Sequence, residues 1–235
     1  MARRVIAASP GLDVLDVGTG TGIAAGQFQA AGCAVLGVDP DVRMAEIARR
    51  RGVSVEVAKF EDWDAAGRTF AAVIAATAWH WVDPVSGAVK AAHVLRPGGV
   101  LAVFGRAFEL PPKLRRVLAA VLAQVAPDPS VLFSADPPKS VVQAYEAMYA
   151  TAADAMREVD QFGDPEQWRI DWERSYRRDE WLDQVPTLGI VTRIAGDKLP
   201  EVLDRMGAAI DAMCGSFTLP YATIGATAIK RSPRS

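Results

Sequence analysis

The segment VLDVGTGTG, residues 14–22, restricts the fold of this chain more than any other feature of its sequence. Three glycines alternate with threonines directly after an apolar run. Glycine adopts positive φ angles at little cost and lets a ligand come close to the main chain. Where such a turn joins a strand to a helix, the helix N-terminus also presents unpaired N–H groups. The segment therefore predicts a strand, a ligand-binding turn and a helix.

The spacing of these glycines separates three kinds of nucleotide site. Gly18, Gly20 and Gly22 form a G-x-G-x-G pattern, whereas the dinucleotide fingerprint G-x-G-x-x-G requires Gly or Ala where this chain has Ile23. No Lys-Ser or Lys-Thr pair follows, which excludes a P-loop. Asp39 ends the next apolar run, GCAVLGVDPD, where a carboxylate can accept hydrogen bonds from both ribose hydroxyls. Asp39 therefore fits an adenosine-containing cofactor with a free 2′-OH, and the glycine spacing speaks against the nicotinamide dinucleotide of an oxidoreductase.

The first hundred residues alternate short apolar runs with helical patterns, which is typical of βα units around a parallel sheet. The apolar runs are continuous rather than alternating, as expected for strands that are covered on both faces. Strands are predicted at residues 13–17, 34–38, 54–57, 71–75 and 100–104, and helices at 23–31, 42–50 and 86–94.

The pattern changes after residue 110, where apolar residues recur at helical spacing and no strand follows. A period of two returns at 168–172, a helix is predicted over 199–213, and a last strand lies within 217–229. We therefore expect a sheet domain built from residues 1–110 and 165–235, and a helical insertion at 111–164 that serves as a substrate lid.

Composition excludes several classes of partner. The formal net charge is -2, the pI is near 5.8, and no Lys/Arg-rich tract occurs, so neither nucleic acid nor an anionic membrane surface is expected as a partner. No apolar run approaches the roughly 18 residues of a membrane span. The two cysteines form neither a disulfide framework nor a metal site, which favours a cytoplasmic protein without a bound metal.

Three segments, VLDVGTGTG, GVDPD and the LRPGG at residues 95–99, together resemble the class I S-adenosylmethionine-dependent methyltransferases. The resemblance is strongest to the small-molecule branch, which includes the ubiquinone/menaquinone, trans-aconitate and type 11 methyltransferases. It implies an α/β, Rossmann-like fold with a seven-stranded, mostly parallel sheet flanked by helices, and a helical insertion after the fifth strand. It also implies an enzyme that transfers a methyl group from S-adenosyl-L-methionine to an O, N or C atom of a small-molecule acceptor and releases S-adenosyl-L-homocysteine.

The resemblance assigns cofactor contacts where the residues match. Asp16 would hold the glycine loop and the amino group of the cofactor, and Asp39 would take the ribose hydroxyls. The adenine end departs from the family, because Lys59 cannot accept a hydrogen bond from the adenine amine, so we expect the Phe60 backbone and Glu61 to serve there. The complete predicted set is Asp16, Gly18, Thr19, Gly20, Gly22, Asp39, Pro40, Met44, Phe60, Glu61, Ala76 and Thr77.

Residues near the transferred methyl group follow the fourth strand in ATAWHW. His80 is the candidate general base, because an imidazole titrates near neutrality, although a packed structural histidine is the more common role. Trp79, Trp81 and Phe108 are expected to line the acceptor site. Methyl transfer from a sulfonium needs chiefly in-line positioning, so the absence of a catalytic triad does not contradict an enzyme.

An alternative arises from the start of the chain. Relatives usually carry further helices ahead of the glycine strand, whereas eleven residues precede Leu12 here. The fold would then act as a cofactor-binding or partner-binding module without turnover. In that case a second subunit, as in a homodimer, would cover apolar surface that those helices usually cover.

Overall fold

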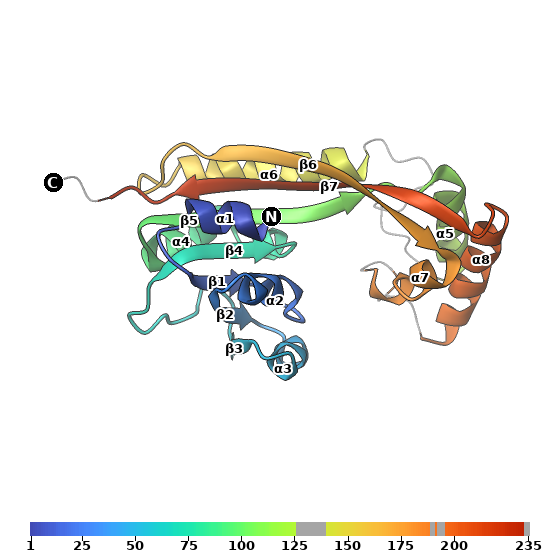
Figure 1. Cartoon of the computed structure of the whole chain (residues 1–235), viewed down its shortest axis with the longest axis horizontal. Coiled ribbons are helices and arrows are strands. Elements are labelled where there is room, and N and C mark those ends of the chain that lie inside the picture. Colours follow the sequence, from blue (N-terminus) through green and yellow to red (C-terminus); the bar gives the residue numbers. More distant parts are fainter. Residues whose placement is uncertain (126–139, 189–190, 192–195, 233–235) are drawn as a thin grey trace. The chain divides into compact units, whose positions relative to one another are not determined.

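A computed structural model describes residues 1–125, 140–188, 191 and 196–232 of the chain (Figure 1). It forms a seven-stranded sheet with the strand order β3-β2-β1-β4-β5-β7-β6. The strands are β1 (Asp13–Val17), β2 (Ala34–Asp39), β3 (Ser54–Val57), β4 (Phe70–Ala76), β5 (Leu95–Phe108), β6 (Glu166–Arg177) and β7 (Ser216–Ile229). The helices are α1 (Ala2–Ala8), α2 (Ile23–Ala30), α3 (Val42–Arg50), α4 (Pro84–Val94), α5 (Pro112–Val125), α6 (Val141–Arg157), α7 (Arg178–Leu182) and α8 (Leu199–Asp211), with short 3₁₀ turns η1 (Trp79–Trp81), η3 (Val185–Thr187) and η5 (Gly196–Lys198).

The sheet topology confirms the predicted mostly parallel α/β fold. Strands β3, β2, β1, β4 and β5 pair in parallel in that spatial order. β7 runs in the opposite direction to β5 and β6, as the arrows in Figure 1 show. The chain leaves β1 toward β2 on one side and returns to β4 on the other, so the strand order reverses between β1 and β4. Ligands of open α/β sheets bind at such a switch point, beyond the carboxyl ends of the strands.

Local sequence signals explain where the helices around this edge begin. The Asp41 side chain accepts a hydrogen bond from the Arg43 N–H and caps α3, and the Asp83 side chain accepts one from the Ser86 N–H and caps α4. Pro84 occupies the first turn of α4, where its missing N–H costs nothing. Each cap satisfies one N–H group that the helix itself leaves without a partner.

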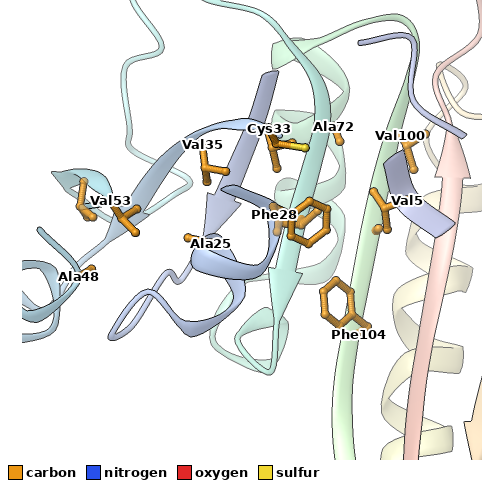
Figure 2. Packing of buried hydrophobic residues seen from close by; sticks show 14 of the residues in the cluster. Val5, Ala25, Phe28, Cys33, Val35, Ala48, Val53, Ala72, Val100 and Phe104 are labelled. Carbon is orange, nitrogen blue, oxygen red and sulfur yellow. The ribbon is translucent and has the colours of Figure 1, made fainter. Parts of the chain in front are cut away.

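Helices α1, α2 and α3 pack on one face of the sheet (Figure 2). Phe28 of α2 and Val5 of α1 lie there against Phe104 and Val100 of β5. The buried members of this cluster are Val5, Val14, Ala25, Phe28, Cys33, Val35, Ala45, Ala48, Val53, Val55, Ala72, Ile74, Val100, Ala102, Phe104 and Trp168. Burial of this apolar surface holds the carboxyl ends of β1, β2 and β4 in register.

The chain divides into two compact units. The first unit contains Met1–Arg106, Tyr145–Ile170 and Thr223–Ser235, and the second contains Ala107–Ala144 and Asp171–Ala222. The second unit has its own apolar core, which is formed by residues of α5, α7, α8 and the adjoining ends of β5, β6 and β7. Its large buried side chains include Leu114, Leu118, Tyr176, Trp181, Met206 and Ile210.

These units group the chain differently from the predicted ranges. Most of helix α6, from Tyr145 onward, belongs to the first unit although it falls within the predicted insertion, whereas residues 171–222 belong to the second. The difference arises because β5, β6 and β7 are long strands, of 14, 12 and 14 residues, and each contributes to both units. Residues 126–139 of the predicted insertion lie outside the described residues. The sequence pattern also missed α1, a short helix of seven residues.

Candidate functional site

The glycine turn lies between β1 and α2, as predicted. Gly18, Gly20 and Gly22 have φ angles of +65°, +56° and +81°, in the region that disfavours residues with a side chain. Gly22 is the N-cap of α2, and no side chain caps that end of the helix. The unpaired N–H groups of the first turn of α2 are therefore available to a ligand.

Gly18 is required for a second reason, which is close packing. A Cβ atom at this position would lie 2.4 Å from the Cβ of Ala78, well inside ordinary contact distance. Ala78 follows β4, so the missing side chain lets the turn after β1 approach the segment after β4. The two segments that flank the switch point of the sheet thus meet at Gly18.

Asp39 fastens the glycine turn to the end of β2. Its Oδ2 accepts a hydrogen bond of 2.7 Å from the Gly20 N–H, and its Oδ1 accepts one of 2.8 Å from the Asp41 N–H. The Gly18 N–H also donates to the Val38 carbonyl at 2.8 Å. Asp39 is 7% exposed, so this carboxylate is both a structural anchor of the turn and a buried charge at the ligand edge.

Asp16 contributes a second carboxylate, and its environment is unusual. The side chain is 1% exposed, and neither carboxylate oxygen has a hydrogen-bond partner. Burial raises the pKa of this carboxyl to about 7; the Ala25 N–H offsets part of the rise without completing a hydrogen bond, and the charge of Asp39 adds to it. The site therefore holds a buried acceptor that a donor or a cation from a ligand would satisfy.

The Thr19 side chain is directed to the main chain rather than to the ligand edge. Its Oγ1 donates a hydrogen bond of 2.7 Å to the Asp16 carbonyl. A Cβ on Gly37 of β2 would lie 2.3 Å from this Oγ1, so the glycine in β2 makes room for it. Thr19 thus supports the shape of the turn through its side chain. Its backbone does so as well, because its N–H donates to the Val38 carbonyl at 3.3 Å and its carbonyl accepts a hydrogen bond of 3.0 Å from the Gly22 N–H.

The predicted adenine-side residues follow β2 and β3. Pro40 is exposed, and Met44 of α3 is 39% exposed. Phe60 is buried, so its backbone rather than its ring is the group that a ligand could meet. Glu61 accepts a hydrogen bond of 3.1 Å from the Asp83 N–H, which ties the β3–β4 connection to the start of α4.

The segment after β4 holds the residues predicted near the methyl group. Ala76 ends β4, and Thr77 has a φ of +57° while its N–H donates to the Phe104 carbonyl at 2.7 Å. A threonine at positive φ is uncommon and is often found at functional sites. The β4 end is therefore held in a sharp turn beside β5.

The three aromatic residues of η1 differ in their surroundings. Trp79 is 3% exposed and packs over Gly87 of α4, with no hydrogen-bond partner for its indole N–H. Trp81 is 75% exposed, and its ring centroid lies 4.8 Å from that of His80. Partial desolvation lowers the pKa of His80 below its ordinary value, so the imidazole is neutral at pH 7. Of the two tryptophans, only Trp81 presents its ring to solvent.

Phe108, the third predicted acceptor residue, belongs to the second unit. Its ring packs edge-on against Trp181 at 6.0 Å between centroids and lies 5.4 Å from the ring of Tyr221. These contacts make Phe108 part of the aromatic core of that unit, and its role toward an acceptor stays a prediction.

Sequence reasoning did not assign Tyr149 to this edge of the sheet. Tyr149 of α6 is buried, and a Cβ on Gly105 of β5 would lie 2.4 Å from its hydroxyl oxygen. Gly105 directly follows Phe104, the residue that binds Thr77, so the Tyr149 hydroxyl lies close to the carboxyl end of β5. It has no hydrogen-bond partner, and burial raises its pKa. The glycine directly after the apolar run of β5 was the available signal in the sequence.

The described residues contain neither a metal-binding cluster nor a membrane-spanning helix. No three His, Cys, Asp or Glu side chains come together as a metal site among them. No described helix is long and apolar enough to cross a lipid bilayer.

Comparison with known proteins relates the first half of the chain to methyltransferases. Residues 14–99 match the model of the methyltransferase domain family. The chain is 38% identical over 91 residues to an uncharacterized methyltransferase of Mycobacterium tuberculosis, and this match covers 37% of each chain. It is 27% identical over 143 residues to demethylmenaquinone methyltransferase of Corynebacterium kroppenstedtii, covering 60% of this chain and 62% of that one. The chain thus matches less than two thirds of the length of these relatives.

Solved structures extend the likeness over nearly the whole chain. A proposed type II methyltransferase of Anaeromyxobacter dehalogenans superposes with a TM-score of 0.62 at 24% identity, covering 96% of this chain and 93% of that one. Phosphoethanolamine N-methyltransferase 2 of Haemonchus contortus, solved with phosphomonomethylethanolamine and S-adenosylhomocysteine, superposes with a TM-score of 0.51 at 14% identity, covering 98% of this chain and 52% of that one. At such identities the two superpositions show a shared fold.

Proposed function

We propose that this chain, whose residues 14–99 match the methyltransferase domain family, is a class I S-adenosylmethionine-dependent methyltransferase that transfers the methyl group of S-adenosylmethionine to a small-molecule acceptor. One observation carries the proposal. The glycine turn, the buried Asp16 carboxylate without a partner and the buried Asp39 carboxylate lie together at the switch point of the sheet.

The residues present fit this cofactor. The three glycines have no side chains that would keep a ligand away from the main chain. At Gly18 a side chain would also collide with Ala78. Asp16 offers an unsatisfied acceptor to the ammonium group of the methionine part. Each Asp39 oxygen accepts one backbone N–H and retains a lone pair, which can accept a ribose hydroxyl.

The chemistry at the site follows from these roles. S-adenosylmethionine, when bound, supplies a methyl group on a positively charged sulfur that leaves as a neutral thioether. The chain must therefore align the acceptor rather than stabilise a leaving-group charge, which is positioning catalysis. The sharp turn at Thr77 and the exposed ring of Trp81 are proposed to line the acceptor site. His80, with its lowered pKa, is proposed to take a proton from an oxygen or nitrogen acceptor.

A small-molecule acceptor is supported by the relatives and by the chain itself. The matched relative from Corynebacterium kroppenstedtii is named for a small-molecule acceptor, demethylmenaquinone. The segment after β4 reads Ala-Thr-Ala-Trp, and it lacks the Asn/Asp-Pro-Pro-aromatic run of nucleic-acid amino-methyltransferases. The net charge of -2 and the lack of a Lys/Arg-rich tract in the sequence also disfavour a nucleic acid as the acceptor.

Isothermal titration calorimetry tests the cofactor assignment. The purified chain is titrated separately with S-adenosylmethionine, S-adenosylhomocysteine and NADH. We expect the first two to bind in the micromolar range and NADH not to bind. Binding of NADH alone would contradict the proposal, and binding without methyl transfer to any member of an acceptor panel would favour the non-catalytic module.

A further inference from the structure

The Asp16 carboxyl group lies where the protein does little to stabilise its ionised form. Both of its oxygens are buried and lack a hydrogen-bond partner. An ionised carboxylate in such a place loses its hydration, and the Ala25 N–H offsets only part of that cost, so the carboxyl group tends to stay protonated. The neighbouring strand supplies a second carboxylate, Asp39, which makes a charge on Asp16 still less favourable.

The elements around Asp16 carry no group that neutralises it. In β4 its register partner is Ile74, and α2, with the sequence IAAGQFQA, has no ionisable side chain. The turn 18–22 contains only glycine and threonine. Arg51 reaches this turn at the Thr21 carbonyl, and His80 of η1 stands two residues beyond Ala78. Neither side chain is hydrogen-bonded to Asp16, whose oxygens lack a partner among the described residues.

We propose that cofactor binding to this chain is coupled to loss of a proton from Asp16, so that the ammonium group of the cofactor takes the place of that proton. The inference rests on the function proposed above and adds a pH control of the same site. Its physical basis is that the ligand brings the one cation that a buried, unpartnered carboxylate beside a second carboxylate requires.

The direction of the effect follows from the ionisation of the free protein. Burial places the pKa of the Asp16 carboxyl at about 7 in the absence of ligand. Below that pH, binding must first expel the proton, so affinity falls as the pH falls; above it the carboxylate is already free, and affinity levels off. For a group with this pKa, affinity at pH 5.5 is about 30-fold weaker than at pH 8, and binding at pH 6 releases about 0.9 proton.

The test is calorimetric titration with S-adenosylhomocysteine at several pH values between 5.5 and 8. Each titration is run in two buffers of different ionisation enthalpy, which gives the number of protons released by the wild-type protein itself. 5′-Methylthioadenosine, which lacks the ammonium group, is the comparison ligand. We expect pH-dependent affinity and proton release with S-adenosylhomocysteine, and little of either with 5′-methylthioadenosine.

Two variants test whether the proton released on binding comes from Asp16. Asp16→Asn is expected to bind S-adenosylhomocysteine weakly and with no pH dependence above that of 5′-methylthioadenosine. Asp13→Asn is the matched control, because Asp13 lies on the same strand but is half exposed and paired with Arg96. It should keep the pH dependence of the wild type. Without ligand, Asp16→Asn should raise the melting temperature relative to the wild type at pH 8 but not at pH 5, where Asp16 is already neutral.

The outcomes separate this inference from the proposed function. If S-adenosylhomocysteine binds with an affinity and a proton release that do not change with pH, the coupling is wrong and the proposed function stands. If both ligands show the same pH dependence, the proton belongs to another group, and the coupling to Asp16 is likewise overturned. If S-adenosylhomocysteine does not bind at any pH, the proposed function fails, and this inference fails with it.

Discussion

Replacement of Gly18 by alanine tests how the glycine turn is built. Gly18 has a φ of +65°, which costs an alanine about 1–2 kcal/mol. The new Cβ would also stand 2.4 Å from the Cβ of Ala78, and overpacking of this kind costs typically about 1–3 kcal/mol. The two costs together predict a loss of about 2–5 kcal/mol in the free energy of unfolding, a large share of the roughly 5–15 kcal/mol of an ordinary domain.

Two matched glycines separate the backbone cost from the packing cost. Gly20 has a φ of +56°, but the nearest atom to its added Cβ is 4.0 Å away, so Gly20→Ala should lose only about 1–2 kcal/mol. Gly26 lies within α2 with open space around it, and Gly26→Ala should stabilise the protein by up to about 1 kcal/mol.

Urea denaturation followed by far-ultraviolet circular dichroism measures all three variants under one set of conditions. The expected order of stability is Gly26→Ala, wild type, Gly20→Ala, Gly18→Ala. If Gly18→Ala and Gly20→Ala lose the same free energy, the contact between Gly18 and Ala78 does not constrain the turn. Close approach of the segments after β1 and β4 at Gly18 would then contribute nothing to stability.

Three further substitutions have defined outcomes. Asp39→Ala removes the acceptor of two backbone N–H groups, so the free energy of unfolding in urea should fall by about 1–3 kcal/mol. The binding free energy for S-adenosylhomocysteine, measured by calorimetry, should weaken by about 1–3 kcal/mol. Unchanged affinity in a folded variant would contradict the assignment of Asp39 to the ribose. His80→Asn should lower the turnover rate by about 10²–10⁴-fold and leave the affinity for S-adenosylhomocysteine unchanged. The turnover rate of the wild type should rise as the pH rises through the lowered pKa of His80. Equal turnover rates of the two proteins would contradict the role of His80 as a base. Tyr149→Phe removes a buried hydroxyl without a partner, so its thermal stability should equal or exceed that of the wild type, and a loss of more than about 1 kcal/mol would show that the hydroxyl is hydrogen-bonded.

Local sequence signals were sufficient to predict the architecture around the glycine turn. The predicted strands 13–17 and 54–57 and the predicted helix 42–50 have the observed bounds of β1, β3 and α3. Such elements are predictable because their signals are local: apolar periodicity, capping aspartates and glycines at positive φ act between residues close in the chain. The same signals predicted the class I methyltransferase fold, and they singled out Asp16 and Asp39 as candidate site residues.

The burial and the hydrogen-bond partners of these residues, by contrast, could not be predicted from local signals. Trp79 and Trp81 look alike in the sequence, yet one is buried over Gly87 and the other is exposed to solvent. Asp16 and Asp39 both follow apolar runs, yet Asp39 receives two backbone N–H groups and Asp16 receives none. Burial and hydrogen-bond partners depend on which distant segments meet, and loss of water around a carboxyl sets its pKa. The sequence therefore predicts two acidic residues at the glycine turn, while the packing of β1, β2 and α2 determines that Asp39 is hydrogen-bonded and that the pKa of Asp16 is raised.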